Sequence, residues 1–316
     1  MADLRFKFLG GMIGTAVGDA IGELAFSHVT KPSLRTRIAQ ATRLVYTDDT
    51  AMAMGLAESL IQCGSIDAQH LGNTFRENYQ REPWRGYASG PPTVFSLVEK
   101  QRIDYVDAAR RLFEGDGSYG NGAAMRIAPV GLFYHDAANL YEQARRSAIV
   151  THAHPVGIDG AAILARAIAW VVPLDPRESF QPQDFLRDLI AFARTETMRE
   201  MLELTQRMLF SNTESWMAGM RLGQGVAAHE SVPFAIYAFL RHSQSFEDCL
   251  FCAAFNSGDR DTVGAMACAI AGAYLGITGI PEQWRKSLEN RRKIEDLAFE
   301  LWDRRVAQSD ITNPGG

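Results

Sequence analysis

Hydrophobic residues recur with a helical period along almost the whole chain, and the alternation typical of a β-strand is nearly absent. Residues 186–193 follow the i, i+3, i+4, i+7 spacing and residues 161–168 repeat it, with charged side chains on other faces. Capping residues such as Asp67 and Asp104 precede further helical segments. Because no internal repeat or shift in composition marks a boundary, we expect one all-α domain of about a dozen helices across residues 1–316.

Charge and hydropathy narrow the functional classes. The chain carries 32 Lys and Arg against 37 Asp and Glu, a formal net charge of −5, which argues against sequence-independent nucleic-acid binding because such binding neutralises phosphates. The uncharged stretch 262–281 is long enough to span a bilayer, but its glycines and the acidic residues before it favour a tightly packed core helix. Four scattered cysteines favour buried or idle thiols, so we expect a cytoplasmic protein. We also expect no membrane partner and a monomer.

Two acidic clusters, residues 46–52 and 257–263, each open an apolar helix. A helix N-cap explains either cluster alone, because Thr and Asp satisfy free backbone N–H groups. Together the two clusters hold more acidic side chains than N-capping requires. Adjacent carboxylates repel one another unless a cation or proton lies between them. Oxygen-only ligands suit Mg²⁺ or Mn²⁺, and about five or six such oxygens are enough for two bridged ions. The candidate metal ligands are Thr47, Asp48, Asp49, Asp259, Asp261 and Thr262.

A glycine-rich apolar stretch lies near the N-terminus. Gly14, Gly18 and Gly22 recur every four residues, which leaves a smooth helix face that another backbone can approach closely. Glu23 lies one turn after Asp19 on the same side of that helix. We expect the glycines to pack against another helix, and Glu23 either to serve as a ligand or acid/base group or only to close the helix.

Residues 115–122 form a second glycine-rich stretch, Gly-Asp-Gly-Ser-Tyr-Gly-Asn-Gly. Glycines at this density let backbone N–H groups converge on an anion, and Ser118, Tyr119 and Asn121 add donors and an aromatic surface. The spacing matches neither the P-loop nor the dinucleotide fingerprint. A glycine-rich turn before a helix is common, so this stretch alone indicates an anion site only weakly.

Four motifs together resemble, in order and spacing, the ADP-ribosylglycohydrolase family, also called ADP-ribosyl-acceptor hydrolases: TDDTAMAM, GNGAAMRIAPVGL, THAHPVG and SGDRDTVGAMACAIAGAYLG. The resemblance covers residues 9–276. It implies a compact, orthogonal all-α fold with a two-metal site, usually Mg²⁺ or Mn²⁺. Such a site hydrolyses the bond between the anomeric carbon of ADP-ribose and its acceptor, so the implied substrate is an ADP-ribosylated protein or a small molecule that contains ADP-ribose.

The resemblance also assigns roles by position. The six candidate metal ligands named above match the family's metal ligands by position. Asp48, Asp49 and Glu23 are the candidate catalytic residues. The candidate substrate-binding residues are Gly117, Ser118, Tyr119, Gly120, Asn121, Gly122 and His152. His152 could equally be a satisfied core histidine near a helix start.

The glutamate position departs from the family pattern. Many members carry an essential glutamate four residues after the last glycine of a GDxxG segment, where this chain has Phe26. Glu23 instead follows Gly22 directly. Because Glu23 and Phe26 are three residues apart on a helix, Glu23 could reach the site from the same face.

The acceptor is left open by the sequence. Arg85-Gly-Tyr87-Ala-Ser-Gly90 and the GSYGNG loop resemble the branch that acts on O-linked ADP-ribose, including serine adducts, poly(ADP-ribose) and O-acetyl-ADP-ribose, more than the arginine branch. An arginine-linked substrate stays an alternative, as does a two-metal phosphohydrolase, although the ligands of the latter normally include histidine. A non-catalytic relative is disfavoured because both acidic clusters are complete.

Overall fold

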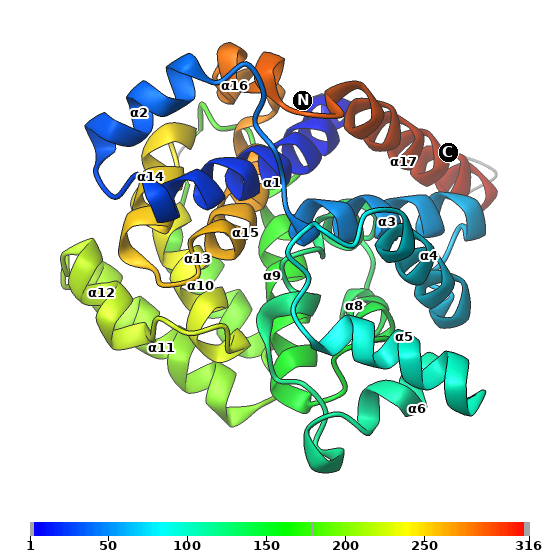
Figure 1. Cartoon of the computed structure of the whole chain (residues 1–316). Helices are drawn as coiled ribbons and strands as arrows, with labels where there is room; N and C mark the ends of the chain where they lie inside the picture. The colour runs from blue at the N-terminus through cyan, green and yellow to red at the C-terminus, as the bar shows by residue number, and fades with distance from the viewer. Residues whose placement is uncertain (1–2, 179, 313–316) are drawn as a thin grey trace.

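The computed structural model describes residues 3–178 and 180–312, with side chains through residue 308 apart from residue 179, and its helices surround a central pair (Figure 1). The first nine α-helices are α1 (Leu4–Ser27), α2 (Lys31–Gln40), α3 (Asp48–Cys63), α4 (Ala68–Arg81), α5 (Gly90–Gln101), α6 (Tyr105–Arg110), α7 (Ala128–Phe133), α8 (Leu140–Ala148) and α9 (Pro155–Val171). The others are α10 (Pro182–Phe192), α11 (Glu196–Phe210), α12 (Ser215–Leu222), α13 (Ala228–Arg241), α14 (Phe246–Asn256), α15 (Arg260–Leu275), α16 (Glu282–Ser287) and α17 (Arg291–Thr312).

The all-α fold expected from the periodicity is confirmed. Over the described residues the chain forms 17 α-helices, three short 3₁₀-helices (Phe113–Gly115, Asn121–Ala123 and Ile277–Gly279) and no β-strand. The expected number of about a dozen helices was too low. Helix α7, for example, has six residues, which is too short for a hydrophobic period to show in the sequence.

Helices α1 and α15 lie side by side at the centre of the molecule (Figure 1). A β-carbon built on Gly14 would lie 2.3 Å from the carbonyl oxygen of Cys268, and one on Gly18 would lie 2.3 Å from that of Gly264. A β-carbon built on Gly272 would lie 2.0 Å from the carbonyl oxygen of Gly10. The two backbones are therefore in direct contact along what we call the glycine seam, and the expected packing role of the glycines is confirmed.

The uncharged stretch that begins at residue 262 is part of this buried pair. Every residue of α15 from Thr262 to Tyr274 is buried. In the part of the chain that the structure describes, no helix is both long and apolar enough to cross a membrane. Three of the four free cysteines, Cys249, Cys252 and Cys268, are likewise buried in the core.

The seam fixes where the two acidic motifs lie. Helix α15 begins at Arg260, directly after Asp259, so its N-terminus carries the second motif. The first motif opens α3, and α1 holds that end in place, because Asp19 of α1 accepts hydrogen bonds from Thr47 and Thr50. One helix pair thus positions both halves of the candidate site.

Candidate functional site

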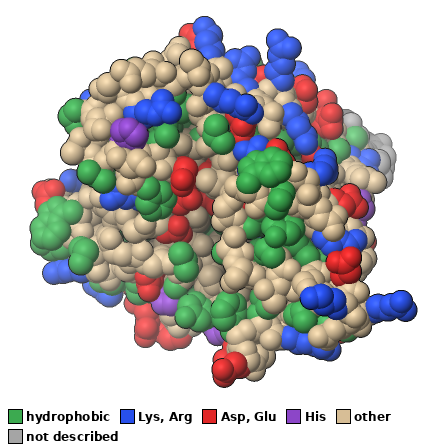
Figure 2. Space-filling view, viewed as in Figure 1, with side chains coloured by type: hydrophobic (Ala, Val, Ile, Leu, Met, Phe, Trp, Pro, Cys, Tyr) green, Lys and Arg blue, Asp and Glu red, His purple; other side chains and the backbone are tan. Residues whose placement is uncertain are grey.

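The two acidic motifs, 213 residues apart between Asp49 and Thr262, meet in space. Thr262 donates a hydrogen bond from Oγ1 to Asp49 Oδ1 at 3.4 Å. Acidic side chains gather in a cleft in the middle of the face drawn in Figure 2. We call Asp48, Asp49, Asp259 and Asp261 the acidic cluster.

Asp19 is a residue of the site that the sequence analysis did not assign. Its carboxylate is fully buried and accepts from the backbone N–H of Thr47 at 3.0 Å, from Thr47 Oγ1 at 2.9 Å and from the backbone N–H of Thr50 at 3.1 Å. It therefore caps the first turn of α3 from another helix. The available signal was a lone carboxylate inside the otherwise uncharged run from Phe8 to Gly22.

The acidic cluster carries more negative charge than its surroundings neutralise. Burial, followed by repulsion from Asp19 and Asp261, raises the pKa of Asp49 well above its usual range. Burial also raises the pKa of Asp48 to about 7 and that of Asp259 to about 7, and in both cases repulsion from Asp261 adds to it. Such a group of carboxylates favours either bound protons or a bound cation.

The donor set fits a hard divalent cation. Asp49 Oδ2 is buried and has no hydrogen-bond partner, so one carboxylate oxygen is free to bind an ion. Hydroxyl and carboxylate oxygens of the two motifs supply the remaining donors, which are the ligands that Mg²⁺ and Mn²⁺ prefer. Among the described residues, however, no three His, Cys, Asp or Glu side chains already converge as a ready metal site. Two carboxylates are engaged elsewhere, since Asp259 accepts from Asn121 and Asp261 accepts from the backbone N–H of Thr262.

We expect the metal-free protein to lose stability as the pH rises. The raised pKa values mean that the folded state binds more protons than the unfolded chain between pH about 4 and about 7, so the free energy of unfolding should fall through that window. Thermal unfolding in EDTA at about pH 5 and about pH 8 measures the slope. Asp48→Asn should flatten it, whereas Asp303→Asn, which changes an exposed carboxylate of α17, should not. A higher melting temperature at the higher pH would contradict this expectation.

A cavity of about 350 Å³ separates the acidic cluster from the second glycine-rich stretch. Asn121 joins its two walls by donating from Nδ2 to Asp259 Oδ2 at 2.6 Å. The cavity is lined by Asp48, Asp49, Asp259, Asp261, Thr262, Gly86, Ala88, Ser89, Gly90, Pro91, Phe113, Ser118, Gly120, Asn121, Gly122, Met125, His152 and Val226. Five of the seven expected substrate-binding residues are in this lining.

Gly117, Tyr119 and Thr47 do not line this cavity. Gly117 has φ +74° and packs against the backbone of residues 153–154. Tyr119 is 52% exposed and its ring contacts those of His154 and His229. The hydroxyl of Thr47 instead donates a hydrogen bond to Asp19.

Phe113 and Val226 are cavity residues that the sequence analysis did not single out. The Phe113 side chain is 59% exposed, and Val226 is 64% exposed. The backbone of Val226 is hydrogen-bonded to the glycine-rich loop, because its carbonyl oxygen accepts from the backbone N–H of Asn121 at 2.8 Å. Neither residue belongs to a local motif, so only the tertiary structure shows that they lie here.

His152 is a neutral hydrogen-bond donor on the cavity wall. Arg126, fully buried, donates to Thr151 Oγ1 at 2.8 Å, and the same oxygen lies 2.8 Å from His152 Nδ1. Since His152 Nδ1 is the one acceptor that the described contacts offer to that hydroxyl, we assign the hydroxyl hydrogen to His152 Nδ1 and the ring proton to Nε2. Burial, with a contribution from Arg126, lowers the pKa of His152 to about 3, so the ring stays neutral. Nε2 faces Gly120 and Gly122 of the loop.

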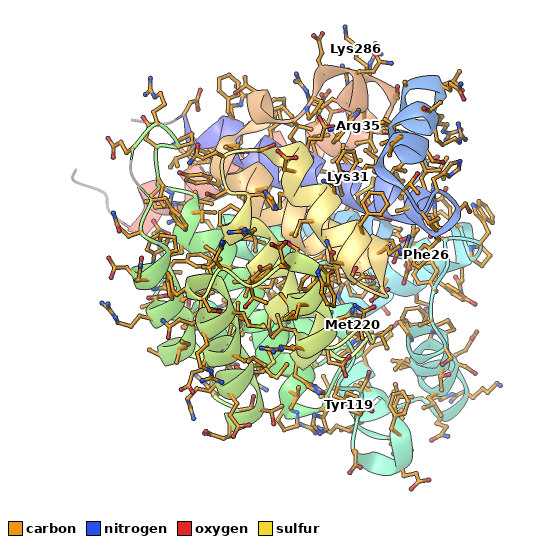
Figure 3. The ribbon with its side chains drawn as sticks, turned by 90° about the vertical axis from the view of Figure 1, so that its left-hand side faces the viewer. Phe26, Lys31, Arg35, Tyr119, Met220 and Lys286 are labelled. Carbon is orange, nitrogen blue, oxygen red and sulfur yellow. The ribbon has the colours of Figure 1, made fainter. Side chains whose placement is uncertain are left out.

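Glu23 lies beside the acidic cluster but outside this cavity. It is exposed near the end of α1, and burial together with repulsion from Asp261 raises the pKa of its carboxyl. It lines a neighbouring cavity with Asp48 and Asp261. Phe26 lines neither cavity and projects outward on the side that also carries Tyr119 (Figure 3).

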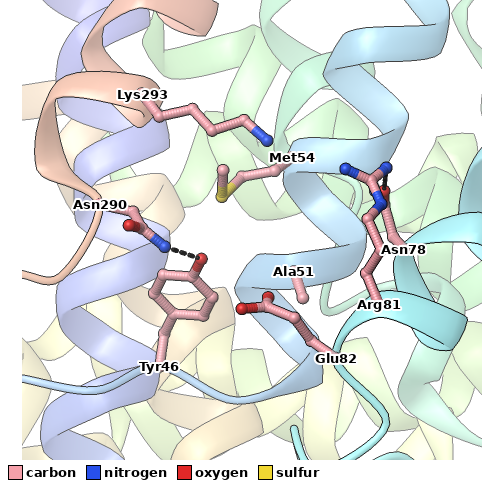
Figure 4. A pocket seen from close by; sticks show the side chains of 8 residues that line it. All are labelled: Tyr46, Ala51, Met54, Asn78, Arg81, Glu82, Asn290 and Lys293. Carbon is pink, nitrogen blue, oxygen red and sulfur yellow. Dashed lines mark hydrogen bonds between the residues drawn. The ribbon is translucent and has the colours of Figure 1, made fainter.

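A further pocket of about 280 Å³ lies between α3, α4 and the start of α17 (Figure 4). Asn290 donates to the hydroxyl of Tyr46 there, while Lys293 and Arg81 lie around the opening. It contains none of the expected site residues. The expected site residues gather instead at the cavity beside the acidic cluster.

Comparisons with known proteins identify the family to which this helical fold belongs. The sequence profile described as ADP-ribosylglycohydrolase matches residues 1–310. Human ADP-ribosylhydrolase ARH3 is 33% identical over 93% of this chain and 92% of its own length, and the ARH3 protein of Danio rerio is 30% identical over 94% and 90%. A solved structure described as an ADP-ribosylglycohydrolase-related protein complex has a TM-score of 0.76 and 25% identity, and it covers 96% of this chain and 100% of that one.

The chain belongs to the ADP-ribosylglycohydrolase family. It is an enzyme of that family, a hydrolase that acts on ADP-ribosyl compounds.

Proposed function

We propose that the enzyme uses two divalent ions, Mg²⁺ or Mn²⁺, to release ADP-ribose from O-linked acceptors. The observation that carries the proposal is the single cavity that joins the acidic cluster to the glycine-rich loop through Asn121 and Asp259. The candidate ligands are the oxygens of Thr47, Asp48, Asp49, Asp259, Asp261 and Thr262. When bound, the ions supply Lewis-acid stabilisation of developing negative charge and help to activate water.

The chain's own residues orient the substrate. Ser118, Gly120 and Gly122 offer polar groups and close backbone approach to the diphosphate. Exposed Phe113 offers a ring surface for the adenine. His152 donates from Nε2 to an oxygen of the substrate without changing its own charge. These contacts would place the anomeric carbon at the acidic cluster.

O-linked acceptors are favoured by the segment 85–90, which resembles that branch of the family. Four of its residues, Gly86, Ala88, Ser89 and Gly90, line the cavity. The decisive measurement is release of free ADP-ribose from matched serine-, arginine-, O-acetyl- and polymer-linked substrates. Preferential release from the arginine substrate would replace this proposal with the arginine branch, and release of inorganic phosphate from phosphoesters would favour a phosphohydrolase.

Glu23 is proposed to move the proton at the acceptor oxygen, because it approaches the acidic cluster from outside the ADP-ribose cavity. Glu23→Gln keeps the size and removes the charge, so turnover should fall by about 10²-fold while ADP-ribose still binds. Steady-state rates and calorimetry measure the two effects. Glu99→Gln, which changes an exposed carboxylate of α5, serves as the control. Turnover of Glu23→Gln within a few-fold of the parent would leave this residue without a catalytic role.

A further inference from the structure

A second cavity of about 380 Å³ adjoins the site cavity. Asp48, Gly86 and Asp261 belong to both linings, so the two spaces meet at the acidic cluster. The second space is lined by Glu23, Leu24, Arg37, Arg43, Val45, Tyr46, Thr47, Asp48, Trp84, Arg85, Gly86 and Asp261. We call it the arginine groove.

The position of the groove relates it to the acceptor, an argument that rests on the proposed function. If ADP-ribose fills the site cavity with its anomeric carbon at the acidic cluster, the scissile bond points away from the glycine-rich loop. The arginine groove opens from the cluster at Asp48 and Asp261, outside that cavity. The group attached to ADP-ribose would therefore enter the groove.

The three arginines of the groove are not equivalent. Arg85 is buried and forms ion pairs with Glu82 and Glu289. It also donates a hydrogen bond to the backbone oxygen of Tyr46, so its role is structural. Arg43 is partly engaged, with its guanidinium 2.5 Å from Glu289.

Arg37, in the last turn of α2, forms no ion pair or hydrogen bond through its side chain with any residue the structure describes. It is half-buried at the groove. The groove thus offers one uncommitted positive charge.

The rest of the wall is apolar and open to solvent. The side chain of Trp84 is 71% exposed and that of Val45 is 50% exposed, with Leu24 beside them in the lining. Exposed apolar side chains beside a charged group are typical of a surface that contacts a peptide. A second ADP-ribose unit fits less well, because its diphosphate carries two negative charges and the groove has one uncommitted cation.

We propose that the arginine groove binds the acceptor segment of an ADP-ribosylated protein, and that Arg37 recognises a carboxylate side chain next to the modified residue. Arg37 is a specificity-determining residue in this proposal. It takes no part in bond cleavage.

Two peptides test the proposal: both carry ADP-ribose on the same serine, and the flanking residues are Asp in one and Asn in the other. The parent should favour the acidic peptide in kcat/KM by about two- to five-fold, the usual effect of a solvent-accessible ion pair. Arg37→Gln should bring the ratio close to one, and Arg37→Glu should reverse it. Arg221→Gln, which removes an exposed charge on α12, should keep the parent's preference.

Equal kcat/KM for the two peptides in the parent, or an acidic preference that persists in Arg37→Glu, would overturn the proposal. Preferential, Arg37-dependent binding of poly(ADP-ribose) over the acidic peptide would also overturn it, in favour of a polymer groove. If the parent releases ADP-ribose from neither peptide, the proposed function has failed. The dissociation constants of the same peptide pair, measured by calorimetry, then decide the groove proposal separately.

Discussion

Removal of divalent metal is expected to abolish the release of ADP-ribose. The reason lies in the acidic cluster, where buried carboxylates repel one another and Asp49 Oδ2 has no partner. A cation would relieve this repulsion and complete the site. The measurement is the rate of ADP-ribose release after exhaustive dialysis against EDTA, followed by titration with Mg²⁺ or Mn²⁺. Full activity in excess chelator would refute metal dependence.

Asp261→Ala separates a metal role from a structural one. Asp261 contributes to the raised pKa values of Asp48, Asp49 and Asp259, so its removal relieves repulsion in the metal-free protein. We expect turnover to fall by about 10²–10³-fold while the metal-free melting temperature stays the same or rises. Asp303→Ala, an exposed change on α17, should alter neither. A matching loss of stability and activity would instead indicate a structural role.

The second large effect is expected at the glycine seam. A β-carbon at Gly18 would lie 2.3 Å from the carbonyl oxygen of Gly264 and 2.7 Å from Cys268 Cβ, so the two helix backbones must separate to accept it. Gly18→Ala should lower the free energy of unfolding by about 2–3 kcal/mol, and Gly18→Leu should prevent cooperative folding.

Gly11→Ala is the matched control on the same helix. A β-carbon there meets mainly the side chain of Leu132, at 3.1 Å, which can move, while alanine improves helix propensity by about 1 kcal/mol. Chemical denaturation should show a change of no more than about 1 kcal/mol for this variant. If Gly18→Ala were as stable as Gly11→Ala, the seam would not be in the close contact described.

What the sequence could predict depended on whether the signal was local. The acidic motifs were recognisable because a run of Thr and Asp at a helix start has more side chains than a cap needs. The loop was recognisable because its glycines lie close together in the chain. Asp19 was not recognisable, because it caps α3 from a different helix. Phe113 and Val226 reach the cavity through loops whose path only tertiary contacts fix.

Glu23 shows a second limit of local reasoning. Its position on α1 placed it near the site, and it does lie beside Asp261. Helical periodicity predicts on which face of the helix a residue lies. It does not predict which of two adjoining cavities that face borders. The structure shows that Glu23 borders the arginine groove, outside the space lined by the glycine-rich loop.

The direct contact of α1 with α15 divides the enzyme into a stiff part and an adaptable part. Two backbones in contact have no layer of side chains that could change rotamer, so hinge motion between these helices would break the contact rather than adjust it. We therefore expect the part of the wall that α15 carries to stay fixed relative to α1 during turnover. On that expectation, closure around a substrate comes from the opposite wall, residues 86–91 and 113–122. A change of acceptor preference then needs new loops on that wall or new side chains in the groove, and it can leave the central helix pair untouched.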